Sequence, residues 1–171
     1  MDVMTAIKGR RSVRNFTDKP IETELIEKLK EALIWAPSAG NMQSRHFYFI
    51  SDKTVKERLA EASLDQWFIA EAPLTIIGAA DTNISRKYGE RGVELYSIED
   101  VSVSMQNLML YAHSVGLGST WVGSFSEDKV RSIVSMPANL RPIAIVPVGY
   151  PAEELPSAPP RVRPEEAVTE L

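Results

Sequence analysis

Apolar residues recur every three or four positions between Glu22 and Trp35, and this spacing predicts an amphipathic helix. The helix must end near Pro37, because proline cannot continue a helical hydrogen-bond pattern. Asp2 is suited to cap a short helix that runs through Lys8. The same pattern predicts further helices over residues 54–62, after Ser126 and, near the end of the chain, over residues 165–168.

Four short runs rich in β-branched or apolar residues predict strands. They cover residues 46–51, 74–80, 118–122 and 141–148. The run at 74–80 lies between Pro73 and Asp81 and is almost wholly apolar, as expected for a strand that is buried on both faces. The chain is therefore expected to combine helices with a sheet.

The most unusual stretch lies between Asp100 and Glu127, which enclose not one charged residue. The sequence from Ser97 to Asp100 fits a capping box and Gly116 is suited to end a helix, so a helix is predicted over residues 98–115. Its apolar residues lie on more than one side, which indicates burial on more than one face. Either this helix is the centre of a monomer or, as we favour, one face forms a subunit interface. Polar residues interrupt the run too often for a membrane span.

The composition is typical of a soluble globular protein. Its 171 residues, 44% hydrophobic and 25% charged, are most simply one domain. A net charge of -4 argues against nucleic acid as the main partner. The chain has no cysteine, which excludes disulfides and thiolate nucleophiles, and neither histidine has a partner at metal-ligand spacing. Neither a signal peptide nor an apolar run of spanning length is present, so we expect a cytoplasmic protein.

Polar segments carry the candidate chemistry. Residues 10–16 (RRSVRNF) hold three arginines and a serine, which suit a phosphate group, although a solvated basic turn has the same composition. The loop over residues 36–43 offers amide and hydroxyl groups of both hydrogen-bonding senses. Residues 116–123 are rich in glycine but match neither a P-loop nor a dinucleotide fingerprint. Residues 151–164 contain five prolines and two arginines and predict an extended tail, either disordered or lying on another surface.

These segments, in this order and approximate spacing, resemble the FMN-dependent nitroreductase family. The resemblance rests on RRSVRNF at 10–16, APSAGNMQ at 36–43, GLGSTWVG at 116–123, and GYPA at 149–152 followed by RVRPEE at 161–166. It implies an α+β fold, a three-layer α/β/α sandwich with a mostly antiparallel central sheet, in an intertwined homodimer. The chain is then a single domain over residues 1–171. Its C-terminal tail, from about 151 to 171, reaches over the partner subunit, and FMN lies at the subunit interface.

The resemblance also implies which residues bind FMN. The arginine segment (residues 10–16) contacts the phosphate, the ribityl chain and the pyrimidine edge of FMN. The polar loop (residues 36–43) lines the flavin from the other subunit. The glycine segment (residues 116–123) approaches the flavin ring, and the tail returns to the phosphate. The residues are Arg10, Arg11, Ser12 and Arg14 in the arginine segment, Pro37, Ser38, Ala39, Asn41 and Gln43 in the polar loop, Trp121, Val122 and Gly123 in the glycine segment, and Arg161 and Arg163 in the tail.

The implied function is an FMN-dependent oxidoreductase in which NADH or NADPH gives hydride to flavin N5. An electron-poor acceptor, a nitroaromatic or a quinone, then takes the same place in a ping-pong cycle, and no side chain is an obligate acid or base. A reductive dehalogenase and a flavin-fragmenting enzyme are alternatives on the same fold. The short segment 82–95 leaves little room for a dehalogenase lid. A flavin-storing protein without turnover and a non-flavin interaction domain are the alternatives from other classes. Ser119 and Thr120 stand where many relatives carry a Thr-Cys pair, so no thiol lies near the flavin.

Overall fold

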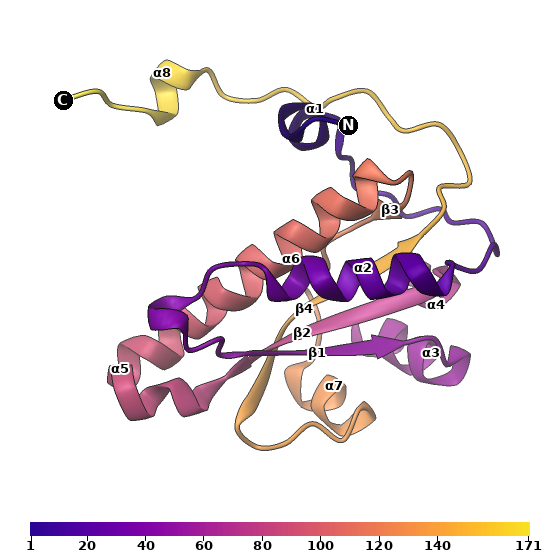
Figure 1. Ribbon diagram of the computed structural model, residues 1–171. Helices are drawn as coiled ribbons and strands as arrows, with labels where there is room; N and C mark the ends of the chain where they lie inside the picture. Colours follow the sequence, from indigo (N-terminus) through magenta and orange to yellow (C-terminus); the bar gives the residue numbers. More distant parts are fainter.

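The computed structural model describes residues 1–171 and centres on a four-stranded antiparallel sheet (Figure 1). Its strands stand in the order β1–β2–β4–β3, and each pair of neighbours is antiparallel. Every residue of β2 except the last is buried, because the strand lies inside the sheet and is covered on both faces. The strands are β1 (Arg45–Ile50), β2 (Leu74–Asp81), β3 (Gly118–Ser119) and β4 (Leu140–Gly149).

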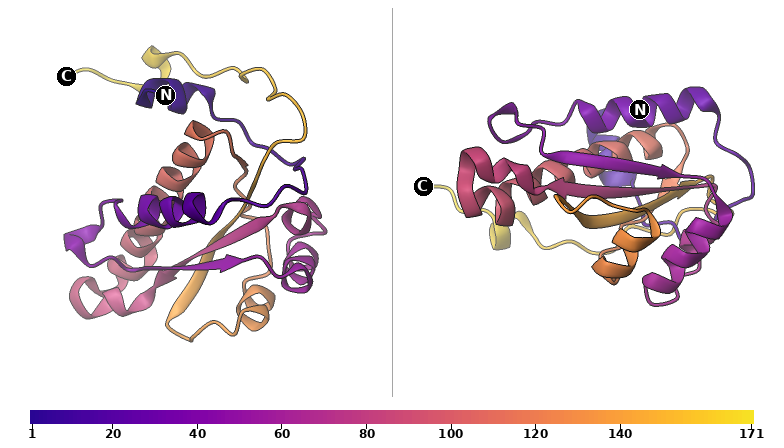
Figure 2. Two further views of the ribbon diagram at one scale, coloured as in Figure 1. Left: turned by 45° about the vertical axis from the view of Figure 1, so that its right-hand side comes forward. Right: turned by 90° about the horizontal axis from the view of Figure 1, so that it is seen from below.

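Helices cover both faces of the sheet, which confirms the α+β, three-layer prediction (Figure 2). The long helices α2 (Thr23–Ile34) and α6 (Ser97–Ser114) lie on one face, and α3 (Lys53–Ala62), α4 (Phe68–Glu71) and α7 (Glu127–Ile133) lie on the other. No helix is both long enough and apolar enough to cross a bilayer. The remaining elements are α1 (Val3–Gly9), α5 (Ser85–Arg91), α8 (Pro164–Ala167), the 3₁₀ turns η1 (Ala39–Asn41) and η2 (Thr82–Ile84), and the π-helical turn η3 (Gly92–Tyr96).

Successive side chains of β2 point to opposite faces of the sheet and pack in two separate hydrophobic cores. Ile76 belongs to the cluster beneath α2 and α6, and Ile77 belongs to the cluster beneath α3 and α7. At Gly78 the sheet and α6 approach so closely that a Cβ atom would lie 2.7 Å from Val101 and 2.8 Å from Met105. The helix predicted over residues 98–115, which carries no charged residue after Asp100, is therefore the one that packs on the central strand.

The start of α6 differs from the prediction. Ser97 does not cap the helix; its hydroxyl donates to the carbonyl of Val93, and the preceding residues already form helical turns. After a kink at Gly89 (φ 56°) within α5, the chain continues through the π-helical turn into α6. At the other end the prediction is confirmed, because Gly116 has a φ of 84° and Leu117 N donates to Ala112 O at 2.9 Å.

The strand predicted over residues 118–122 is shorter than expected. Only Gly118 and Ser119 form β3, and Val122 rejoins the sheet through an isolated bridge to Ile145. Trp121 lies between these two points of attachment and is exposed. The interruption places this part of the chain at the edge of the sheet rather than inside it.

The tail leaves the sheet at Pro151, which pairs with Phe16, while Ala152 N donates to Asn15 O at 3.0 Å. Beyond that point it is extended and exposed, and it passes α1 before the predicted short helix appears as α8 (Figure 1). An exposed arm of this kind suits a surface on another molecule. Its place over a partner subunit stays a prediction.

Candidate active site: two half-sites at the ends of one helix

The arginine segment is joined to the glycine segment. After α1 the chain becomes extended, Val13 N donates to Ser119 O at 3.0 Å, and Ser12 pairs with Ser119 in parallel. Gly118 is required here, because a Cβ atom at this position would lie 2.7 Å from Val13. The close packing brings together two stretches of sequence that are about a hundred residues apart.

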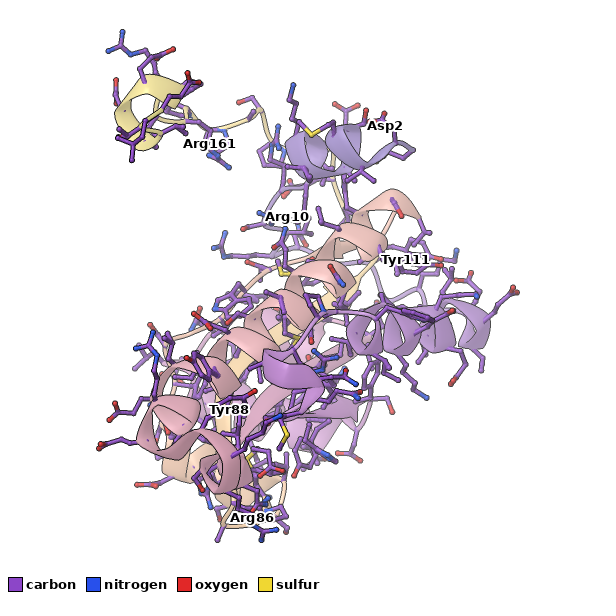
Figure 3. The ribbon with its side chains drawn as sticks, turned by 60° about the vertical axis from the view of Figure 1, so that its left-hand side comes forward. Asp2, Arg10, Arg86, Tyr88, Tyr111 and Arg161 are labelled. Carbon is purple, nitrogen blue, oxygen red and sulfur yellow. The ribbon has the colours of Figure 1, made fainter.

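Cations gather at the end of α1 without acidic partners. Burial, and then the charges of Arg161 and Arg11, lower the pKa of Arg10. No ion pair within 4.0 Å includes Arg10, Arg14 or Arg161. Figure 3 shows Arg10 and Arg161 near α1, although they come from opposite ends of the chain. Arg10 is half-buried, whereas Arg14 and Arg161 are exposed. Guanidinium groups without a carboxylate partner are the donors that an anion such as phosphate prefers.

His113, in the last turn of α6, packs against the end of α1 next to these arginines. Gly9 lies so close to it that a Cβ there would be 2.6 Å from Nε2 of the imidazole. Burial, followed by the charges of Arg10 and Arg11, lowers the pKa of His113. The C-terminal end of α6 therefore supports the arginine segment from beneath.

Three of these arginines have other partners in this chain. Arg161 Nη1 donates to the carbonyl oxygens of Pro159 and Pro160 at 3.3 and 3.2 Å. Arg11 donates to the carbonyl oxygens of Lys8 and Arg10, and its Nε donates to Pro156 O of the tail at 3.2 Å. Arg163 pairs with Glu166 at 2.8 Å. Arg11 thus ties the tail to the arginine segment, whereas Arg163 is held within α8.

A groove of about 450 Å³ separates the arginine segment from the tail and is lined by both. Ser12 and Arg14 face it from one side, and the opposite wall is formed by Pro151 and residues 153–156. The guanidinium of Arg14 also lies 5.8 Å from the centre of the Phe68 ring. The predicted residues of this segment are therefore accessible to a ligand at the protein surface.

The loop between α3 and α4 lies beside the end of the glycine segment, and no pattern in the sequence indicates it. Gln66 Nε2 donates to Ser63 O at 2.7 Å and to Ser124 O at 3.4 Å, which joins the loop to the chain just after Gly123. Leu64 and Asp65 both have positive φ values, 59° and 57°. Leucine is not a residue type that favours this conformation, so the turn left no clear signal in the sequence.

The polar loop is shaped by a buried carboxylate on α6. Asp100 is 3% exposed and accepts hydrogen bonds from Ala39 N at 2.9 Å and from Ser44 N at 3.1 Å. The loop holds three residues with positive φ, Gly40, Asn41 and Gln43. Such a backbone persists only where its surroundings hold it in place.

A second clamp comes from Arg45, whose guanidinium donates to the carbonyl oxygens of Ile34, Ala36 and Pro37. These bonds satisfy carbonyl groups at the end of α2 that have no partner within the helix. Asp100 and Arg45 thus hold the polar loop from two sides. Within it Pro37, Asn41 and Gln43 are exposed, and Ser38 and Ala39 are half-buried.

The polar loop does not meet the arginine segment within one chain. The arginine segment leads into the start of α2, and the loop follows its end, so the 12 residues of the helix separate them by roughly 18 Å. The structure thus brings together the arginine segment, the glycine segment and the start of the tail, and leaves the polar loop apart. The prediction that a second subunit supplies this loop agrees with the separation but stays a prediction.

Comparison with known proteins shows the same family over most of the chain. The model of the Nitroreductase family matches residues 7–71 and 67–150. A protein of Methanothermobacter thermautotrophicus named "Putative NADH dehydrogenase/NAD(P)H nitroreductase" is 35% identical over 157 residues, which cover 90% of this chain and 79% of that protein.

Solved structures agree with this assignment. A crystal structure from Parabacteroides distasonis, which bears the same description, superposes with a TM-score of 0.84 at 27% identity and covers 98% of this chain and 96% of that one. A Clostridium difficile protein titled an FMN-dependent nitroreductase has a TM-score of 0.84 at 24% identity, with 98% and 99% covered. The latter likeness supports the fold.

Asp100→Ala should disorder the polar loop, because two backbone N–H groups lose their acceptor inside the protein. We expect a loss of about 2 kcal/mol in the free energy of unfolding, measured by urea denaturation, and faster amide exchange at Ala39 and Ser44. Glu99→Gln, at the exposed neighbouring position, is the matched control and should change neither. Unaltered exchange at both amides in Asp100→Ala would show that the loop holds its shape without the carboxylate.

Proposed function

Because this chain belongs to the nitroreductase family, we propose that it is an FMN-dependent oxidoreductase. It takes hydride from NADH or NADPH through flavin N5 and passes it to an electron-poor acceptor, a nitroaromatic or a quinone, in a ping-pong cycle. The observation that carries the proposal is the group of unpaired arginines gathered from both ends of the chain.

The residues present fit the phosphate end of FMN. Arg10 and Arg161 are close enough for one to lower the pKa of the other, and neither has a carboxylate partner. Like charges held together in this way are unfavourable until an anion joins them. A phosphate group supplies that charge and accepts hydrogen bonds from guanidinium groups in two-pronged geometry. The donor set is therefore that of a phosphate site.

The remaining residues of the half-site bind and orient the rest of the cofactor. In this proposal Ser12 and Arg14 face the ribityl chain and the pyrimidine edge from the groove beside the tail. Arg14 stabilises negative charge that develops at that edge on reduction. Trp121 and the exposed backbone of Gly123 lie at the ring, while Val122 anchors them through its two bonds with Ile145. When bound, FMN supplies the two-electron chemistry.

We further propose a homodimer in which the polar loop of one subunit completes the half-site of the other. Apolar side chains stand exposed along α1 and at the end of α2, including Val3 at 71% and Trp35 at 79%. A groove of about 370 Å³ lies between α1, α2 and α6 and is lined mostly by hydrophobic residues. Exposed apolar surface of this extent suits a second copy of the chain, over which the tail then lies.

The visible absorption spectrum of the purified protein tests the proposal first. We expect a flavin band, about one FMN per chain released on denaturation, and oxidation of NADH or NADPH when a quinone is added. A coloured protein that reduces no acceptor would indicate flavin storage. A colourless protein that takes up no added FMN would contradict the proposal as a whole.

Arg14→Ala should weaken FMN retention and lower the reduction potential of the bound flavin, because the variant no longer stabilises negative charge on the reduced ring. The expected shift is about 30 mV, the equivalent of ~1.4 kcal/mol for a two-electron couple. Spectroelectrochemistry and the FMN dissociation constant measure the two effects. Arg58→Ala, an exposed arginine on α3, is the control. Unchanged affinity and potential in Arg14→Ala would remove Arg14 from the site.

Mixing two inactive variants tests whether each site is shared between subunits. Arg10→Ala should disable the arginine segment, and Asn41→Ala with Gln43→Ala should disable the polar loop. A heterodimer of the two, isolated with two different affinity tags, holds one site with both defects and one intact site. We therefore expect about half of the wild-type activity. If a site were built within one chain, every site of the heterodimer would carry one defect and no activity would return.

A further inference from the structure

A second group of cations lies on α5, beside the polar loop. Arg86, Lys87 and Arg91 are exposed, and none of them forms an ion pair within 4.0 Å. The only acidic residue of α5 is Glu90, so this short helix carries an excess of positive charge in a protein whose net charge is -4. The proposed cofactor contacts do not use these three side chains.

The side chains of Lys87 and Tyr88 pack directly on the polar loop at Gly40. A Cβ atom at Gly40 would lie 2.1 Å from the Tyr88 hydroxyl and 3.0 Å from Lys87 Nζ. Glycine is therefore required at this position both for its positive φ of 52° and for the room it leaves. Whatever the loop faces in the assembled protein, Lys87 is next to it.

Two of the three cations, Lys87 and Arg91, contact the aromatic side chains of Tyr88 and Tyr96, on either side of a kink at Gly89. Tyr88 packs edge-on against Tyr96 with ring centres 5.4 Å apart, and Arg91 Nε donates to the Tyr96 hydroxyl at 3.0 Å. Gly92, in the π-helical turn, is in close contact with Tyr88 and Ile84. Lys87 Nζ lies 5.2 Å from the centre of the Tyr88 ring. Arg91 and Lys87 thus rest on aromatic side chains, and side chains held in this way lose less entropy when they bind a ligand than side chains on a free loop.

This basic group is separate from the one proposed for the FMN phosphate. Figure 3 shows Arg86 and Tyr88 at the end of the molecule away from Arg10 and Arg161. Within the proposed dimer, the polar loop and α5 approach the flavin together from one subunit, while Arg10 belongs to the other. One anion site thus serves the cofactor, and a second is available for a charged substrate.

We propose that Arg86, Lys87 and Arg91 recognise the 2′-phosphate of NADPH, so that NADPH rather than NADH is the preferred reductant. The inference rests on the proposed function, because the loop must line the flavin for α5 to lie along the path of the dinucleotide. The two reductants differ only in this phosphate monoester. Guanidinium and ammonium groups discriminate in its favour through charge-assisted hydrogen bonds.

The ratio of kcat/KM for NADPH to that for NADH tests the proposal in the FMN-loaded protein. We expect a ratio above about ten, which Lys87→Ala lowers by about tenfold and Lys87→Arg largely retains. Lys53→Ala, at a position on α3 whose side chain is 82% exposed, is the matched control and should leave the ratio unchanged. Equal use of the two nucleotides by the wild-type protein, or a ratio that Lys87→Ala does not alter, would overturn the proposal.

Calorimetry provides a readout that does not depend on turnover. The FMN-loaded protein should bind 2′,5′-ADP more tightly than 5′-AMP, and Lys87→Ala should abolish the difference. Inorganic phosphate is the third probe, because equal affinity for it would indicate a general phosphate site and contradict dinucleotide recognition.

Failure of this inference can be told from failure of the proposed function. A protein that holds FMN and oxidises both nucleotides equally contradicts the inference alone. A protein that holds no FMN and oxidises neither contradicts the proposed function, and the inference with it.

Discussion

Helix α6 packs on the central strand at Gly78, where no side chain would fit between the strand and Val101, and this contact fixes the ends of the helix relative to the sheet. The helix is 18 residues long, or roughly 27 Å. Near its start Asp100 holds the polar loop, and near its end His113 lies beneath Gly9 and the arginine segment. One rigid element therefore supports both half-sites and also keeps them apart.

The separation has a physical consequence for assembly. Two half-sites on one rigid helix cannot meet unless the core deforms, and close-packed cores resist deformation. In the proposed dimer, a two-fold axis at right angles to α6 and near its middle would remove the conflict, because the start of one α6 would then lie near the end of the other. The exposed apolar side chains of α1 and α2 and the outward-reaching tail are the surfaces that such a copy needs.

Hydrophobic periodicity and helix-capping residues predicted most helices and strands of this fold, because both depend on interactions between residues that are close in the sequence. The long helices, the buried strand β2 and the glycine end of α6 are confirmed, and so is the cap at Ser126, whose hydroxyl accepts from Lys129 N. Ser97 was misjudged because the residues before it also turn helical, which a local capping pattern does not reveal. The role of Asp100 depends on a partner 61 residues away, and no local rule indicates such a contact.

The two groups of cations also explain why net charge is a poor guide to this protein's ligands. Several acidic residues sit in exposed pairs such as Lys28 with Glu31, which add little to stability. Arg10 with Arg161, and Lys87 with its neighbours on α5, are left without such partners. Because an anion is attracted by the local field rather than by the sum over the chain, an acidic protein can bind phosphate groups at both ends of one helix. If each end serves a different subunit's site, cofactor binding and dimer formation stabilise each other, since FMN then binds only the assembled form.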